Sequence, residues 1–389
     1  MKITNQSWRR QFVCRGSIER LFLLSLCLAT IMSCSSGHHE HKTLKDAFAG
    51  KFLIGTAMNV REIAGADTVA TRLIKQQFDA IVAENCMKSE NIQPEEGQFH
   101  FEMADRLVAF ARKNHLVVTG HTLIWHSQTP AWFFTDSTGN QVSRGELIQR
   151  MKKHIETLVG RYRGRVKGWD VVNEAINDDG SYRKSKFYEI IGKEYIPMAF
   201  KFAHEADPKA ELYYNDYSTA KPEKRAGIVA MVKDLQRQGI RINAIGMQTH
   251  IGLDFPDIHD YENTMEAFAA LGVKVMVTEM DLTVLPSPHA NVGAEVSASF
   301  DYQKKLNPYA GGLPDSVIRK FNARYTDFFK LFLKHQKQIS RVTLWGISDA
   351  ESWRNDWPVK GRTDYPLLFD RNYQPKPIVE KLIQMAKNN

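Results

Sequence analysis

Two glutamates follow short apolar segments that are typical of buried strands. Glu174 ends the segment WDVVNE at residues 169–174, and Glu279 lies in the segment TEMD at residues 278–281. Two carboxyl groups that face one pocket suit glycoside hydrolysis, because one can protonate the leaving oxygen while the other meets the developing oxocarbenium ion. If they lie about 5–5.5 Å apart, the second attacks directly and the anomeric configuration is retained. Glu174 and Glu279 are therefore the first candidates for catalysis.

Other residues near these glutamates have types that support a carboxylate or bind a sugar. Asn173, directly before Glu174, can hydrogen-bond a sugar hydroxyl, and His250 together with Asp281 can hold the charge and orientation of a nucleophile. Tryptophan rings offer flat apolar faces to sugars, and four of the seven are candidates: Trp125, Trp132, Trp345 and Trp353. Packing in the core is the alternative for each of these rings.

Eight short β-rich apolar segments, which alternate with amphipathic helical segments, must position these residues. The predicted strands are 52–57, 80–84, 116–120, 166–172, 211–214, 244–247, 274–278 and 341–345. This alternation over about 340 residues predicts an α/β fold, a (β/α)8 TIM barrel with a single catalytic domain. A doubly wound sheet is the alternative, but it would need a glycine-rich turn after the first strand, and the segment GTAM at residues 55–58 is not one.

Seven of the eight predicted strands are followed by polar or aromatic residues. Barrel active sites are built at the C-terminal ends of the strands, so we expect these residues to converge. Besides the residues named above, the strand ends supply Glu84, Asn85, Lys88, His121, Gln128, Asn215 and Gln248. One carboxylate after a strand is more often a helix cap or a surface residue, but this many polar strand ends together indicate a site.

The first 33 residues differ from the rest of the chain. Five basic residues precede an apolar segment at residues 21–32, which is typical of a secretory signal and is short for a membrane span. The segment IMSC at residues 31–34 resembles a bacterial lipobox, which predicts lipidation of Cys34. A cleaved signal with an incidental cysteine is the alternative. Residues 34–43 are expected to form a polar tether, and residues 44–389 the catalytic domain.

The net charge of +8 and the four cysteines change meaning once this leader is removed. Half of the charge leaves with it, and no basic tract or aromatic–basic module remains to bind nucleic acid. Cys14 and Cys27 leave as well, and Cys34 would carry the lipid. Cys86 remains, and we expect a small buried hydrophobe rather than a catalytic thiol. No internal disulfide is therefore expected.

Seven motifs, taken together and in order, carry a resemblance to a known family: ENCMK, GHTLIWHSQTPAW, WDVVNEA, YYNDY, GMQTHI, VTEMD and WGISDAESWR. Through them, the chain from Leu44 to Ala386 resembles the endo-β-1,4-xylanases of glycoside hydrolase family 10. The resemblance implies a (β/α)8 barrel, a retaining double-displacement mechanism, and neither a metal nor an organic cofactor. Xylan and xylo-oligosaccharides are the implied partners.

The resemblance also implies roles for individual residues. Glu174 matches the general acid/base and Glu279 the nucleophile, while His250 and Asp281 match the pair that supports the nucleophile. Asn173 matches the asparagine that contacts the 2-hydroxyl of the reacting sugar. The implied substrate contacts are Glu84, Asn85, Lys88, His121, Trp125, Gln128, Asn215, Gln248, Trp345 and Trp353. Bulk at Trp353 would crowd the carbon that carries the hydroxymethyl group in glucose, which favours xylose.

Alternative functions remain open at this point. The same residues would serve a β-1,4-glucanase or a xylosidase that acts at chain ends, and a catalytically inactive, lipid-anchored glycan-binding protein would also keep the cleft. The expected location is the cell envelope, as a lipoprotein of the outer membrane or periplasm, with secretion if Cys34 is not lipidated. The only expected contact with a membrane is the lipid anchor, and a monomer is expected.

Overall fold

The computed structural model describes residues 43–287 and 299–389 of the chain. These residues belong to one compact unit. The predicted signal peptide, Cys34 and all of the predicted tether except its last residue lie outside them. Within the described residues, no helix is both long enough and apolar enough to cross a membrane.

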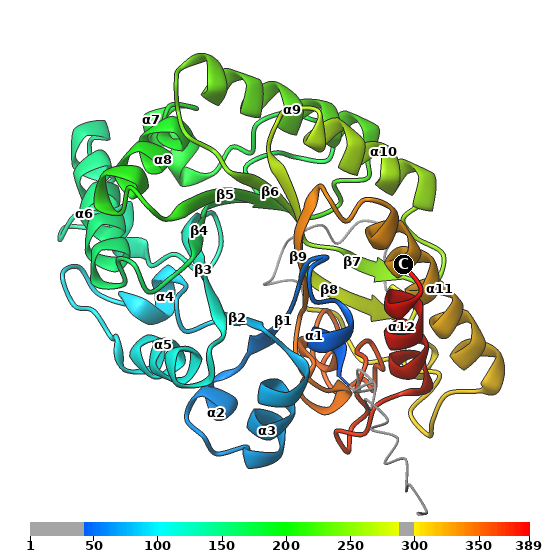
Figure 1. Ribbon diagram of the computed structural model, residues 1–389. Helices are drawn as coiled ribbons and strands as arrows, with labels where there is room; N and C mark the ends of the chain where they lie inside the picture. Colours follow the sequence, from blue (N-terminus) through cyan, green and yellow to red (C-terminus); the bar gives the residue numbers. More distant parts are fainter. Residues whose placement is uncertain (1–42, 288–298) are drawn as a thin grey trace, which may run out of the picture. The chain divides into compact units, whose positions relative to one another are not determined.

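Eight parallel strands form a closed barrel with helices around it (Figure 1). Their hydrogen-bonded order is β6-β5-β4-β3-β2-β1-β9-β8, and β8 pairs with β6 to close the ring. A further short strand, β7, pairs with the far end of β8. The predicted TIM barrel is confirmed, and the doubly wound alternative is wrong because the sheet closes on itself. The strands are β1 Leu53–Met58, β2 Ala80–Ala83, β3 Val117–Trp125, β4 Gly168–Asn173, β5 Glu211–Asp216, β6 Ala244–Met247, β7 His250–Gly252, β8 Lys274–Thr283 and β9 Ile339–Leu344.

Two strands continue well beyond their predicted ends. β3 extends past Gly120 to Trp125, and β8 extends past Thr278 to Thr283. The added residues still pair with neighbouring strands: Trp125 lies opposite Asn173 of β4, and Asp281 lies opposite His250 of β7. Polar side chains in the mouth of the barrel therefore do not end a strand, because the backbone groups keep their hydrogen-bond partners.

The longer helices pack on the barrel through one apolar face each. In α5, for example, Ala104, Leu107, Val108 and Ala111 are buried, at the three- and four-residue spacing of a single helix face. Helix α6 begins after Ser143, whose side chain accepts a hydrogen bond from the N–H of Glu146. The helices are α1 Leu44–Ala47, α2 Val60–Ile63, α3 Thr68–Gln77, α4 Ser89–Ile92, α5 Glu102–Asn114, α6 Arg144–Arg161, α7 Lys186–Ile191, α8 Tyr195–Ala206, α9 Pro222–Arg237, α10 Ile258–Ala269, α11 Asp315–Lys334 and α12 Pro377–Lys387.

Helix α1 lies at the end of the barrel where the strands begin. The N–H of Leu44 donates to the side chain of Gln77 at 3.0 Å, and Gln77 ends the helix that leads into β2. Phe48 stacks on Phe52, directly before β1, and its ring also meets Phe329 of α11. Helix α1 contacts α12 as well (Figure 1). The chain thus enters the barrel at the face opposite the C-terminal ends of the strands.

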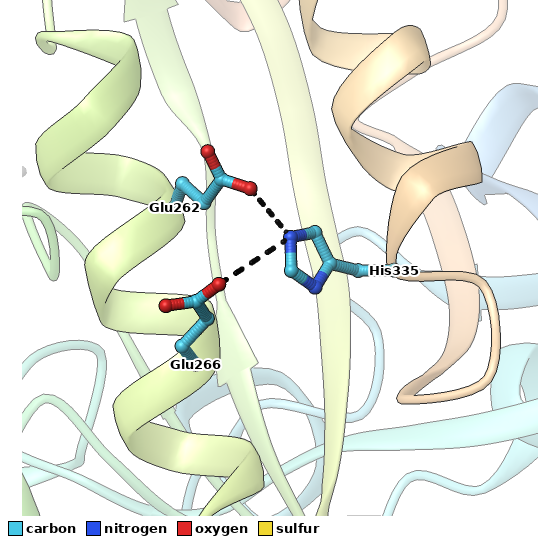
Figure 2. Close-up of side chains that lie close together, drawn as sticks. All are labelled: Glu262, Glu266 and His335. Carbon is cyan, nitrogen blue, oxygen red and sulfur yellow. Dashed lines mark hydrogen bonds and ion pairs between the residues drawn. The ribbon is translucent and has the colours of Figure 1, made fainter.

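Charged side chains join α10 to the end of α11 on the outside of the barrel (Figure 2). Nε2 of His335 lies 2.6 Å from Oε1 of Glu262 and 4.0 Å from Oε1 of Glu266. Nζ of Lys334 also lies 2.6 Å from Oε1 of Glu262. Glu262, Glu266 and His335 are close enough to offer ligands to a metal ion. Lys334 and His335 both lie against the same oxygen of Glu262 and so link the two helices.

Cys86 lies in the hydrophobic core beside the barrel and is 6% exposed. Burial raises the pKa of its thiol to about 12. Because the thiolate is the reactive form of cysteine, Cys86 is not suited to nucleophilic catalysis. Its expected role as a small buried hydrophobe agrees with this position.

Candidate active site

A cavity opens at the C-terminal ends of the barrel strands. Next to it, the strand register shifts between His121 and Ile124 in β3 and between Asp170 and Val172 in β4. Such irregularities turn side chains away from the regular alternation of a strand. Ten of the residues predicted for the site line the cavity: Lys88, His121, Trp125, Asn173, Glu174, Gln248, His250, Glu279, Trp345 and Trp353.

Glu174 lies directly after β4 and is only 4% exposed. Its φ of +57° is in the left-handed region, which is uncommon for a residue with a side chain, and Nε of Arg183 donates to its carbonyl oxygen at 2.8 Å. Its carboxylate accepts hydrogen bonds at 2.8 Å from Nε1 of Trp125 and from Nε2 of Gln248. Burial, and then the charge of Asp216, raises the pKa of Glu174 to about 6.

Glu279 lies within β8 and is 5% exposed. Its Oε1 accepts a hydrogen bond from Nδ2 of Asn215 at 2.8 Å, and its Oε2 lies 3.3 Å from Nε2 of His250. Burial acts to raise the pKa of Glu279, but the hydrogen bond from His250 and the nearby His121 and Lys88 together lower it below its ordinary value. Glu279 is therefore held as a carboxylate. Glu174, with a pKa of about 6, can both hold and release a proton near neutral pH.

His250 is oriented by Asp281, which is fully buried. Nδ1 of His250 lies 2.9 Å from Oδ1 of Asp281, and Nε1 of Trp353 donates to Oδ2 at 2.7 Å. Burial opposes the charge on both groups, but Arg354 and His250 lower the pKa of Asp281 to about 2. Asp281 and Glu279 likewise raise the pKa of His250 to about 9 despite its burial. Below that pH, His250 is a cation beside Glu279.

Three amide side chains connect the two glutamates. Nδ2 of Asn215 donates to Oε1 of Glu279 at 2.8 Å and to Oδ1 of Asn173 at 3.0 Å. Nε2 of Gln248 donates to Oε1 of Glu174 and lies 3.5 Å from the same oxygen of Asn173. The two carboxylates thus belong to one hydrogen-bonded group.

Asn215 is predicted as a substrate contact, but the structure places it behind Glu279. It is fully buried and does not line the cavity. Oγ1 of Thr278 donates to its Oδ1 at 2.6 Å, and Gly246 leaves space for it, since a Cβ there would lie 2.3 Å from the same oxygen. We therefore describe Asn215 as a residue that positions Glu279.

Lys88 lies after β2 and contacts three of the other residues predicted for the site. Its Nζ donates to Oδ1 of Asn85 at 2.9 Å and to Oε1 of Gln128 at 3.0 Å, and it lies 5.0 Å from the ring centroid of Trp125. Asn85, Gln128 and Glu84 do not line the cavity described above. Asn85 and Gln128 hold Lys88 in place. Burial raises the pKa of Glu84, and the nearby charge of Lys88 offsets part of that rise.

The aromatic walls of the cavity are fixed by their neighbours. The ring of Trp345 meets that of His121 at 5.4 Å, and Nδ1 of His121 lies 2.9 Å from Oδ2 of Asp170. Trp353 stacks on Trp357, with 4.7 Å between ring centroids. Both Trp345 and Trp353 line the cavity, and their contact with a sugar stays a prediction.

Trp132 is a candidate sugar platform that the structure does not bring to the cavity. It is absent from the cavity lining. Its Nε1 donates to the carbonyl oxygen of Gln93 at 3.1 Å, and its ring stacks on Phe133 with 4.0 Å between centroids. The alternative of packing is therefore the correct one for Trp132, because its polar and apolar partners are both within the protein.

Several residues of the cavity have no role in the sequence-based prediction. Arg354 and Tyr217 both line the cavity, and each is the last residue of a motif, WGISDAESWR and YYNDY. Their place in these motifs is the sequence feature that could have predicted them. Nη2 of Arg183 donates to the hydroxyl of Tyr217 at 2.8 Å. Trp357 and Phe255 also line the cavity, but they lie in loops, and no pattern of spacing predicts them.

Known proteins resemble this chain over most of its length. The model of glycosyl hydrolase family 10 matches residues 43–385. The chain is 49% identical to the endo-1,4-beta-xylanase A of Xylanibacter ruminicola over 364 residues, which cover 94% of this chain and 98% of that protein. It is 40% identical to the endo-1,4-beta-xylanase of Geobacillus stearothermophilus over 345 residues, which cover 88% of this chain and 98% of that protein. A solved GH10 endoxylanase from a sugarcane soil metagenome superposes with a TM-score of 0.86 at 46% identity, covering 88% of this chain and 99% of that one. The chain belongs to glycosyl hydrolase family 10.

Proposed function

We propose that the protein is a retaining endo-β-1,4-xylanase that hydrolyses internal β-1,4-xylosidic bonds of xylan. The observation that carries this proposal is the pair of buried carboxyl groups whose surroundings move their pKa values in opposite directions. Such a pair assigns the acid and the carboxylate of a glycosidase. The two relatives named above, both endo-1,4-beta-xylanases, support xylan as the substrate.

In the first step, Glu279 attacks the anomeric carbon while Glu174 donates its proton to the leaving glycosidic oxygen. The bond from the anomeric carbon to the leaving oxygen breaks as the bond to a carboxylate oxygen of Glu279 forms. His250, held by Asp281, keeps Glu279 ionised and oriented before attack. Asn173 is placed between the two glutamates, where it can bind a hydroxyl of the reacting sugar.

In the second step, water replaces the enzyme on the anomeric carbon. Glu279 has no charge while it is esterified, and its charge otherwise raises the pKa of Glu174. The pKa of Glu174 therefore falls in the intermediate, and its carboxylate accepts a proton from the attacking water. Glu279 leaves with its charge restored. Two inversions at the same carbon give net retention.

Lys88, His121, Trp345 and Trp353 supply sugar contacts in this proposal. The ring of Trp353 is held by its hydrogen bond to Asp281 and by its stack on Trp357. A ring held on two sides cannot move away from a larger sugar. We therefore expect a hydroxymethyl group, as in glucose, to collide with Trp353, so that xylose is preferred.

A reducing-sugar assay on soluble xylan tests the activity, with Glu279→Ala as the inactive control. Azide or formate should partly restore cleavage by this variant and give product of inverted configuration, because the small anion enters the space of the missing carboxylate. Restored cleavage with retained configuration would contradict Glu279 as the nucleophile. Product profiles from xylan, xylo-oligosaccharides and mixed-linkage glucan separate this activity from that of a glucanase or a chain-end xylosidase.

For its location, we propose an exported lipoprotein of the cell envelope that is anchored through Cys34 and acts as a monomer. The supporting observation is the order of basic, apolar and small residues before Cys34. The test is metabolic labelling with a radioactive fatty acid in a bacterial host. Label should appear in the wild type and be absent from Cys34→Ala. Equal labelling of both, or of neither, would contradict the anchor.

A further inference from the structure

Two carboxylates and an imidazole from different helices meet on the outside of the barrel (Figure 2). Glu262 and Glu266 lie on α10, and His335 directly follows α11. Their ligand atoms all lie within 4.8 Å of one another. None of the three lines the cavity that holds Glu174 and Glu279, so the group is separate from the candidate active site.

Packing between the two helices fixes this arrangement. Glu262 and Glu266 are four residues apart and therefore share one face of α10. The ring of Tyr261 on the same helix meets the ring of Phe328 of α11, with 4.9 Å between centroids. The N–H of His335 donates to a carbonyl oxygen in the last turn of α11 at 3.1 Å, and the residue is 9% exposed. Packed helices, which favour a defined binding geometry, thus present all three side chains.

The types and number of donor atoms fit zinc. Zn²⁺ binds imidazole nitrogen and carboxylate oxygen together, most often as four ligands in a tetrahedron, whereas Mg²⁺ and Ca²⁺ prefer oxygen ligands. The side chain of Glu266 is 58% exposed, so water can reach the group and supply the fourth ligand.

The distances between the donor atoms also suit a zinc ion. Two ligand atoms of a tetrahedral zinc ion lie about 3.3 Å apart, since each bond is about 2.0–2.2 Å long. Nε2 of His335 lies 2.6 Å from Oε1 of Glu262 and 4.0 Å from Oε1 of Glu266. These separations lie on either side of the required one, and the exposed side chain of Glu266 is free to close the longer of them.

Lys334 is the cation that a zinc ion has to replace. Its Nζ lies 2.6 Å from Oε1 of Glu262, the oxygen that Nε2 of His335 also contacts. The side chain of Lys334 is largely exposed, and ion pairs at such positions contribute little to stability. Lys334 can therefore turn into solvent, and the two charges of a zinc ion balance those of the two carboxylates.

We propose that Glu262, Glu266 and His335 bind one zinc ion, with water as the fourth ligand, and that the ion joins α10 to α11. An ion that binds the folded chain more tightly than the unfolded chain stabilises the fold. The site therefore raises the stability of the barrel where zinc is present. The proposal is independent of activity on xylan, because no catalytic step is assigned to the ion.

Zinc binding to the full-length protein, freed of metal with EDTA, tests the site. Equilibrium dialysis measures the number and affinity of bound zinc ions, and thermal denaturation with and without zinc measures the stabilisation. His38, His39 and His41 also have ligand side chains, so the wild type is compared with variants that keep them. We expect the affinity for one zinc ion to fall at least about tenfold in Glu266→Gln and in His335→Gln, and the rise of Tm caused by zinc to fall with it.

Lys334→Met distinguishes a metal site from a set of ion pairs. Zinc should bind this variant more tightly than the wild type, because the competing ammonium is gone. Glu156→Gln on α6, which also removes an exposed carboxylate paired with a lysine, is the matched control and should bind zinc like the wild type. An unchanged number and affinity of zinc ions in Glu266→Gln, binding to Lys334→Met that is weaker or unchanged, or equal affinity of the site for Mg²⁺ and Zn²⁺ would each overturn the proposal.

Discussion

The guanidinium of Arg354 holds one oxygen of Asp281 with two nitrogens, Nε at 2.8 Å and Nη2 at 2.7 Å. Asp281 is fully buried, and its other oxygen accepts the indole N–H of Trp353. The same carboxylate orients His250. Arg354 therefore acts on Glu279 through two intermediates, without any contact of its own with the nucleophile.

Replacing Arg354 by methionine should leave the charge of Asp281 buried with one fewer partner. Breaking a buried ion pair from one side costs about 3–5 kcal/mol of stability. Small misplacements of catalytic groups cost up to about 100-fold in rate, so we expect kcat to fall by at least about tenfold. Urea denaturation and initial rates on xylan measure the two effects.

Arg237→Met is the matched control for that change. Arg237 is exposed and pairs with Asp234 at the surface, where ion pairs contribute about 0–1 kcal/mol. Equal losses of stability in the two variants would show that the contact between Arg354 and Asp281 stabilises the protein no more than a surface ion pair does.

The hydrogen bond from Trp125 to Glu174 should be visible in the pH dependence of kcat/KM. Glu174 must be protonated for the first step, so the alkaline limb of the profile should lie near its pKa of about 6. The bond from Trp125 stabilises the carboxylate, and Trp125→Phe should therefore move this limb to higher pH. Initial rates on soluble xylan between pH 4 and 9 measure it. Trp132→Phe, outside the cavity, is the control and should leave the alkaline limb in place. A shift of the limb to lower pH in Trp125→Phe would contradict its assignment to Glu174.

His250 should make the stability of the protein fall as the pH rises. Its folded pKa of about 9 is above the ordinary value of 6.5, so its protonated form stabilises the fold fully below pH 6.5. This stabilisation is lost as the pH rises through about 9. Free energies of unfolding at pH 6, 7, 8 and 9 should therefore fall more steeply in the wild type than in His250→Gln.

The comparison with the variant is needed because another group titrates in the same range. Burial raises the pKa of Glu62 to about 8, and this contributes a slope of the same sign in both proteins. Identical slopes in wild type and variant would show that the pKa of His250 is not raised in the folded protein.

Gly246→Ala should disturb Asn215 and, through it, Glu279. The new Cβ would lie 2.3 Å from Oδ1 of Asn215 and 2.8 Å from Cγ2 of Thr278. Overpacking of this kind typically costs about 1–3 kcal/mol, and we expect kcat to fall together with stability. Thermal denaturation and rates on xylan measure both.

The same substitution at Gly160 provides the comparison. Gly160 lies in α6, and a Cβ there meets nothing within 4 Å. Alanine favours a helix over glycine by up to about 1 kcal/mol, so Gly160→Ala should keep full activity and the same or higher stability. A loss of activity in Gly160→Ala as large as in Gly246→Ala would mean that the close approach to Asn215 is not the cause.

The sequence predicts the barrel and both glutamates because these depend on local signals. Apolar periodicity marks the strands, and polar residues at the strand ends mark the site. The extension of β3 to Trp125 was not predictable in this way, since it depends on pairing with Asn173 across the sheet. The contrast between Trp125 and Trp132 has the same origin: both rings lie in one motif, and only tertiary packing decides which of them meets Glu174.

Long-range contacts account for the other differences. Asn215 is predicted as a sugar contact because it follows an apolar strand. Thr278 donates a hydrogen bond to it and Gly246 leaves space for it, so that it lies behind Glu279 instead. Arg354 meets Asp281 across 73 positions of the chain, and no local pattern records such a pair. Phe255 has no sequence signal either, and Arg324 in a distant helix donates to the carbonyl oxygens of Gly252 and Pro256 on either side of it.

The position of α1 has a consequence for how the enzyme meets a polymer. The described chain begins at the face where the barrel strands start, while the cleft opens where they end. A group or surface linked to the chain ahead of helix α1 is therefore joined to the barrel at the face remote from the cleft. We expect such a linkage to leave the cleft open, so that a long, branched polysaccharide can still enter it.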